Sequence, residues 1–127
     1  MSEFRILSVD DEPDICNLLD EVLTGEGYQV RTAHDSRSAM QVFHDFNPHL
    51  VLLDVMLPDE NGIEILKKMM AEDNNVKVVM VSAFMDLKIA KEAIKYGAIE
   101  YVGKPIQLDN LIEYISGLEK DTLGEEA

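Results

Sequence analysis

Three consecutive acids follow the first apolar segment of the chain. Asp10, Asp11 and Glu12 come directly after residues 4–9, which read FRILSV. Two carboxylates about 4 Å apart repel each other by roughly 4 kcal/mol at an effective dielectric constant of about 20. A divalent cation would offset this repulsion, and Mg²⁺ binds one or two carboxylates together with water and phosphate oxygens. The acids also suit the positive end of a helix dipole, so both readings stay open for this segment alone.

Three more residues with side chains that could take part in chemistry lie at the ends of later apolar segments. They are Asp54, Ser82 and Lys104. Taken singly, they could be a turn aspartate, a hydroxyl bonded to the backbone and a plain turn before proline. If their segments are neighbouring parallel strands, about 4.8 Å apart, Asp54 can share one pocket with Asp10 and Asp11. A hydroxyl and an ammonium on the other side of a bound cation would complete a site for a phosphoryl group.

The segments that must position these residues alternate between two periodicities. Ile15, Leu18, Leu19, Val22 and Leu23 follow the spacing of a helix with one buried face. Alternation of such segments with short apolar ones predicts an α/β fold, a single doubly wound (βα)5 domain with a five-stranded parallel sheet and helices on both faces. The apolar segments are residues 4–9, 28–33, 49–55, 76–83 and 98–103.

The apolar segments also predict their order in the sheet. Residues 49–55 and 76–83 are nearly continuous apolar runs, as is typical of strands covered on both faces. Residues 28–33 and 98–103 mix polar and apolar side chains, which indicates edge strands. With right-handed crossovers, the order 2-1-3-4-5 satisfies both patterns. Ligand sites in such sheets lie beyond the carboxyl ends of the strands where the order reverses, here between the first and third strands.

The composition is that of a globular protein with a strong excess of acids. The 127 residues are 46% hydrophobic and 28% charged, with a formal net charge of −14. This charge argues against direct binding of nucleic acid or of an anionic membrane. The single cysteine allows no internal disulfide, and no segment reads as a signal peptide or a membrane span. We therefore expect a cytoplasmic location.

The order of the motifs along the chain resembles that of the receiver domains of two-component response regulators. The resemblance covers residues 4–118 and rests on five elements at successive strand ends: Asp10-Asp11, Asp54 with MLPDENG after it, Ser82-Ala83, Tyr101 and Lys104-Pro105. It implies a receiver domain over residues 1–118, with residues 119–127 as an acidic tail or the start of a linker. It also implies a phosphorylation-activated switch that catalyses only its own phosphorylation and dephosphorylation.

The resemblance assigns a role to each site residue. Asp54 would accept a phosphoryl group, and Asp10 and Asp11 would hold Mg²⁺, with Mn²⁺ as a candidate substitute. Asp54 and the backbone carbonyl of Met56 would be further metal ligands. Lys104 would pair with the phosphoryl oxygens.

Four other residues complete the implied site. Ser82 would bond to the phosphoryl oxygens, and the Tyr101 side chain would follow that movement. The resemblance raises the expectation of a cis peptide bond before Pro105 above the base rate of about 5–6%. Phe84, two residues after Ser82, would flank the path of hydrolytic water, as Met56 would. Neither side chain can orient water, so we expect a phosphorylated state that lasts many minutes or longer.

The implied partners are proteins. A sensor histidine kinase or a phosphotransfer protein would donate the phosphoryl group. A downstream output domain or protein would contact the fourth helix, the fifth strand and the fifth helix. Lys88, Lys91 and Lys95 share one face of the fourth helix, which suits an acidic partner. A second copy of the chain is a further candidate partner: its Asp109 and Glu113 would contact these lysines in a phosphorylation-dependent homodimer. The alternative is that the lysines only form a solvated helix face.

Two other functions compete with the switch. A magnesium-dependent phosphohydrolase would use an aspartyl nucleophile, but it needs a general acid two residues later, where this chain has Met56. A flavin or nucleotide carrier would need a phosphate-binding loop rich in glycine or hydroxyl residues after the first strand. This chain places three acids there instead.

Four further residues are expected to have no part in the chemistry. His34, His44 and His49 show no ligand spacing and are expected to lie away from the strand ends. Cys16 is expected to be a partly buried side chain of the first helix.

Overall fold

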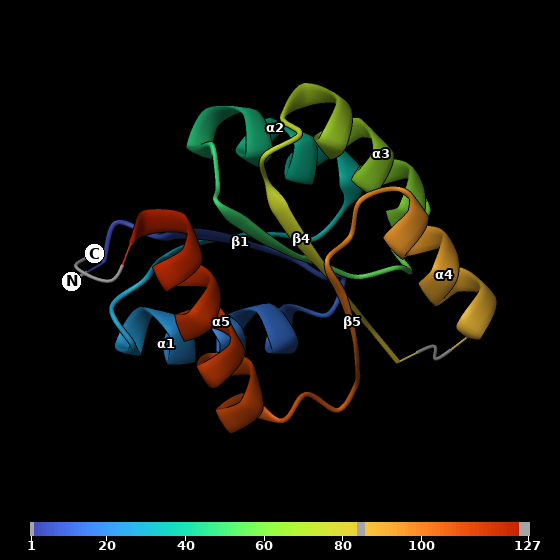
Figure 1. The fold of residues 1–127 in the computed structure, drawn as a ribbon. Coiled ribbons are helices and arrows are strands. Elements are labelled where there is room, and N and C mark those ends of the chain that lie inside the picture. Colours follow the sequence, from blue (N-terminus) through green and yellow to red (C-terminus); the bar gives the residue numbers. More distant parts are fainter. Residues whose placement is uncertain (1, 84–85, 125–127) are drawn as a thin grey trace.

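The computed structural model describes residues 2–83 and 86–124. Five strands and five helices alternate along these residues (Figure 1). The strands are β1 (Arg5–Val9), β2 (Gln29–Ala33), β3 (Leu50–Leu53), β4 (Lys77–Ser82) and β5 (Glu100–Gly103). The helices are α1 (Pro13–Gly25), α2 (Ser36–Phe46), α3 (Gly62–Glu72), α4 (Leu87–Lys95) and α5 (Leu108–Leu123).

The strands form one parallel sheet in the order β2-β1-β3-β4-β5, which confirms the predicted topology. All four residues of β3 are buried, whereas β2 and β5, at the two edges, are only partly covered. Burial therefore follows the contrast between apolar and mixed segments that the sequence shows.

The sheet separates two hydrophobic cores. Helices α2, α3 and α4 cover one face and α1 and α5 cover the other (Figure 1). Because successive side chains of a strand point to opposite faces, β1 contributes Leu7 and Val9 to the first core and Ile6 to the second. Among the described residues, none of the helices has the length and hydrophobicity that a bilayer crossing requires.

The buried face of α1 differs from the one predicted. Leu19 and Leu23 are buried as expected, but Leu18 is 47% exposed, so its predicted burial is wrong. Cys16 is fully buried rather than partly buried. The reason is that α1 turns the stripe of Cys16, Leu19 and Leu23 toward the sheet, at spacings of three and four residues, and this stripe leaves Leu18 at its margin.

Helix α5 continues past residue 118, where we expected the domain to end. Its last residue is Leu123, which packs against the core on the α1 side of the sheet. Glu119 accepts hydrogen bonds from the hydroxyls of Ser2 and Tyr28, which join the end of α5 to the start of the chain. The domain boundary itself stays a prediction.

The connection from β3 to α3 turns back tightly against the end of β3. The Gly62 N–H donates to the Val55 carbonyl at 2.7 Å, and Met56 and Asn61 form an antiparallel bridge. A Cβ atom on Gly62 would lie 2.2 Å from the backbone oxygen of Asp54 and 2.8 Å from the Val55 Cα. Helix α3 can therefore begin at this position only because residue 62 has no side chain.

We expect Gly62→Ala to lower the free energy of unfolding by about 1–3 kcal/mol, the usual cost of forcing extra atoms into a packed site. Gly117→Ala is the matched control, since nothing lies within 4 Å of a Cβ there. Inside α5 it should instead raise the free energy of unfolding by about 0.5–1 kcal/mol. Urea denaturation measures both values. Equal changes in the two variants would contradict the close approach at Gly62.

Candidate functional site

The predicted site residues lie at the carboxyl ends of the strands. Asp10 follows β1, Asp54 follows β3, Ser82 ends β4 and Lys104 follows β5. The first three are polar yet only 3%, 4% and 1% exposed, respectively. Since β1 and β3 are neighbours, Asp10 and Asp54 lie at the point where the strand order reverses.

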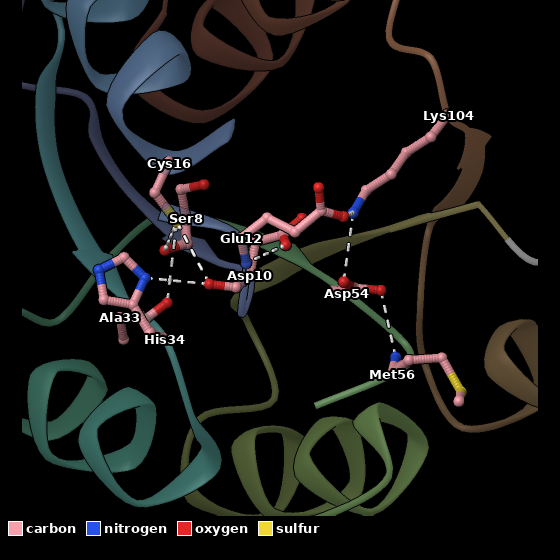
Figure 2. A network of polar contacts seen from close by, with 9 residues as sticks. All are labelled: Ser8, Asp10, Glu12, Cys16, Ala33, His34, Asp54, Met56 and Lys104. Carbon is pink, nitrogen blue, oxygen red and sulfur yellow. Dashed lines mark hydrogen bonds and ion pairs between the residues drawn. The ribbon is translucent and has the colours of Figure 1, made fainter. Parts of the chain in front are cut away.

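The Lys104 ammonium joins the two buried aspartates (Figure 2). Its Nζ lies 2.6 Å from Asp10 Oδ2, 3.3 Å from Asp54 Oδ2 and 3.4 Å from Glu12 Oε1. The Lys104 N–H donates to the Ser82 carbonyl at 2.9 Å, which continues the β4–β5 pairing and sets where the side chain starts. The peptide bond between Lys104 and Pro105 is cis.

Lys104 is held in its charged form by these acids. Burial would lower its pKa, but the hydrogen bond to Asp10 and the charges of Asp54 and Asp10 raise the pKa above the usual value of lysine. The ammonium therefore provides part of the charge compensation that the acidic sequence requires.

The Asp54 carboxylate has a different partner on each oxygen. Oδ1 accepts the N–H of Met56 at 3.1 Å, and Oδ2 faces Lys104. Burial raises the pKa of Asp54, and the charge of Asp10 acts in the same direction. The Met56 N–H and Lys104 oppose this shift without cancelling it. The contacts fix the orientation of the carboxylate.

An acidic cluster lies beside this network. Asp10, Asp11 and Glu12 each offer a carboxylate oxygen, and these atoms lie within 4.8 Å of one another. The Glu12 N–H donates to Asp10 Oδ1 at 2.9 Å, which fixes Asp10 relative to the start of α1. Hard oxygen donors of this kind suit Mg²⁺ or Ca²⁺ rather than a thiophilic metal. The cluster is consistent with a metal site.

Glu12 also lies at the site, although the family resemblance assigned it no role. It shares the cluster with Asp10 and Asp11 and also faces Lys104. The run of three acids was the available signal. Asp54 lies outside the cluster of three and is joined to Asp10 through Lys104.

Ser82 and Tyr101 are in contact beside Asp54. Burial raises the pKa of Tyr101, while a hydrogen bond with the Ser82 side chain acts in the opposite direction. Ala83, directly after Ser82, is exposed. Phe84 lies outside the described residues.

The expectation that the histidines lie away from the strand ends is wrong for His34. It directly follows β2, and its Nδ1 lies 3.0 Å from the backbone oxygen of Asp10 (Figure 2). The predicted segment 28–33 and β2 both end at Ala33, so the sequence already placed His34 at the edge of the sheet that carries the site. His49 precedes β3 at the opposite end of the sheet, where its Nδ1 accepts the Arg5 N–H. His44 pairs with Glu72 on the surface.

The raised pKa of Asp54 has a consequence for stability. For this group the folded-state pKa lies above the unfolded value. Its contribution to stability is therefore fully present below the unfolded pKa and is lost as the pH rises through the folded pKa. At neutral pH, the ionised carboxylate makes folding less favourable than a neutral group of the same shape would.

We therefore expect Asp54→Asn to melt at a higher temperature than the wild type at pH 7 in EDTA. The difference should shrink as the pH falls through the pKa of Asp54. Thermal unfolding followed by circular dichroism over a pH series measures it. A variant that melts below the wild type at pH 7 would mean that the pairing with Lys104 outweighs the cost of burial.

Known proteins share both the sequence pattern and the fold. A family profile for the response regulator receiver domain matches residues 6–116. Sporulation initiation phosphotransferase F of Bacillus subtilis is 38% identical over 111 residues, which cover 87% of this chain and 90% of that protein. Chemotaxis protein CheY of Thermotoga maritima is 32% identical over 117 residues, which cover 91% of this chain and 98% of that protein.

Longer proteins contain a related segment. Regulatory protein AtoC of Escherichia coli is 36% identical over 107 residues, 84% of this chain but only 23% of that protein. Among solved structures, a CheY-like receiver domain protein from Methanospirillum hungatei superposes with a TM-score of 0.92 at 30% identity, covering 98% of this chain and 99% of the other. The chain thus belongs to the response regulator receiver domain family of two-component systems, which implies phosphorylation-based signalling by a typically non-enzymatic module.

Proposed function

We propose that Asp54 accepts a phosphoryl group from a phosphohistidine on a sensor histidine kinase or a phosphotransfer protein. The observation that carries this proposal is the setting of Asp54. Its carboxylate is buried and oriented by the Met56 N–H and by Lys104, and the acidic cluster lies next to it. The membership in the receiver family and the similarity to a phosphotransferase support the same reaction class.

Mg²⁺ is the proposed cofactor, held by Asp10, Asp11, Asp54 and the backbone carbonyl of Met56. When bound, it would neutralise charge on the carboxylates and on the incoming phosphoryl oxygens. The oxygen donors of the acidic cluster support this assignment. Glu12, a member of the cluster that also faces Lys104, would accept hydrogen bonds from water bound to the metal.

In the transfer step, an oxygen of Asp54 forms a bond to phosphorus while the bond from phosphorus to the donor's imidazole nitrogen breaks. The electron pair of that bond stays on the nitrogen, which takes a proton from solvent. Lys104 then exchanges its contact with Asp54 for the new phosphoryl oxygens. The Ser82 hydroxyl donates to another of these oxygens, which changes its contact with Tyr101.

This change at Tyr101 is the proposed signal to the output surface, which comprises α4, β5 and α5. Besides Lys88, Lys91 and Lys95, α4 exposes the large apolar residues Leu87 and Ile94. Apolar side chains beside positive charge suit an acidic protein surface, either an output partner or a second copy of this chain.

The alternative of a magnesium-dependent phosphohydrolase has less support. Met56, which is 62% exposed, occupies the position where such an enzyme needs a general acid. A thioether cannot transfer a proton, so no group at this position would protonate a leaving alcohol. A protein that turns over p-nitrophenyl phosphate would restore this alternative.

The direct test is phosphorylation by acetyl phosphate with Mg²⁺, followed by borohydride trapping and mass spectrometry. We expect one modification, on Asp54, and none in EDTA or in Asp54→Asn. Asp11→Ala should label more slowly, because the metal loses an oxygen ligand.

An Asp54→Asn protein that labels as fast as the wild type would rule out Asp54 as the acceptor. Sedimentation of the same samples tests whether the output surface binds a second copy of this chain. If phosphorylated and unphosphorylated protein sediment with the same mass, self-association does not occur through that surface.

We also expect slow loss of the phosphoryl group, because the Met56 side chain next to Asp54 cannot orient a water molecule. Acid–base assistance typically contributes about 10²–10⁴-fold, and we expect Met56→Asn to recover part of it and shorten the half-life roughly tenfold. Met56→Leu is the matched control, since it keeps the bulk and stays apolar. A phosphate-release time course measures all three proteins. A wild-type half-life of seconds, unchanged in Met56→Asn, would contradict the expectation.

A further inference from the structure

A carboxylate from the β3–α3 loop is bonded to the first turn of α2. Asp59 Oδ1 accepts the Ser36 N–H at 2.8 Å. Its Oδ2 accepts the Ser36 hydroxyl at 2.7 Å and the Arg37 N–H at 3.3 Å. The first N–H groups of a helix have no partners within the helix, and the positive end of the helix dipole attracts anions. These hydrogen bonds hold the pKa of Asp59 below its usual value.

Helix α2 already has a capping residue of its own. Asp35 precedes the helix, and its Oδ1 accepts the Ser38 N–H at 2.8 Å and the Ser38 hydroxyl at 2.6 Å. Asp35 therefore stabilises the start of α2 from within the β2–α2 connection. Asp59 reaches the same helix end from a loop 23 residues further along the chain. Its contact restrains the β3–α3 loop as well as the helix.

The restrained loop contains the groups that orient the phospho-acceptor. Met56, three residues before Asp59, donates its N–H to Asp54 Oδ1. Met56 also forms the bridge to Asn61, and Gly62 then packs against the backbone of Asp54. The loop is thus closed at its base by Gly62, and its outer part is bonded to α2 through Asp59.

We propose that Asp59 is a positioning residue for the acceptor site. By binding the first turn of α2, it fixes the β3–α3 loop, and through Met56 it orients the Asp54 carboxylate and the Met56 carbonyl. The proposed effect on the Met56 carbonyl rests on the proposed metal site, in which that carbonyl is a ligand. The orientation of Asp54 does not, because the hydrogen bond from the Met56 N–H is present without a metal.

The experiment compares Asp59→Ala with Asp35→Ala, two variants that each remove one carboxylate from the same helix end. The first readout is amide hydrogen exchange of Met56 in EDTA. We expect about fivefold faster exchange in Asp59→Ala, the factor that loss of one helix-end cap typically carries. Asp35→Ala should leave exchange at Met56 unchanged, although it lowers the melting temperature.

The second readout is Mg²⁺ affinity by calorimetric titration of the purified chain. Groups that hold metal ligands in place typically account for about 10–100-fold in affinity, and we expect about tenfold weaker binding in Asp59→Ala. Asp59→Asn retains an acceptor oxygen for the Ser36 N–H and should recover part of the loss. Ser36→Ala removes only the hydroxyl that donates to Asp59, so it should weaken Mg²⁺ binding less. It replaces Asp59→Ala in both measurements if that variant folds poorly.

Two results would overturn the proposal. In one, the Met56 amide exchanges as slowly in Asp59→Ala as in the wild type. The same result in Ser36→Ala counts equally if that variant is used instead. In the other, Asp35→Ala accelerates exchange at Met56 as much as Asp59→Ala does, so that only the stability of α2 matters. A wild type that binds no Mg²⁺ while Asp59→Ala still accelerates exchange at Met56 would refute the metal site and support the positioning role.

Discussion

The charge of Lys104 is the constraint on which the acidic end of the sheet depends. Two buried carboxylates, Asp10 and Asp54, lie within 3.3 Å of its Nζ. Leaving a buried charge without a partner typically costs about 3–5 kcal/mol, so neither aspartate could stay ionised at low cost alone. Because the lysine enters from the end of β5, it reaches both aspartates only when β1, β3, β4 and β5 are in register. The electrostatics of the site and the order of the sheet therefore support each other.

A divalent cation and the lysine would use the same acids. Asp10 Oδ2 contacts Lys104, and Asp10 Oδ1 accepts the Glu12 N–H, so both oxygens are engaged in the structure. Each carboxylate oxygen has a second lone pair, which leaves room for coordination without breaking these contacts. A cation placed there would repel the ammonium, and an incoming phosphoryl group would attract it. A cation and a phosphoryl group bound there would thus act on the lysine in opposite directions.

The sequence was informative where local pattern and topology decide the outcome. The continuous apolar run around β3 and the mixed segments of β2 and β5 were enough to predict the sheet order and the meeting of Asp10, Asp54 and Lys104. The burial of Cys16 in place of Leu18 depends on a small rotation of α1, which spacing alone does not resolve. The position of His34 beside Asp10 was predictable, because the predicted segment 28–33 ends at the same residue as β2. The bond from Asp59 to Ser36 joins residues that no periodicity relates.

The burial of Cys16 has a practical consequence. Its sulfur lies beneath α1, 3.5 Å from the backbone oxygen of Asp10, and burial raises the pKa of the thiol to about 11. At pH 7 only about one thiol in ten thousand would then be the reactive thiolate. We therefore expect the thiol of the folded chain to react only slowly with maleimides and mild oxidants. A cysteine introduced on the surface would be the sole reactive thiol, so a spin label or fluorophore could be attached at one site without replacing the native residue.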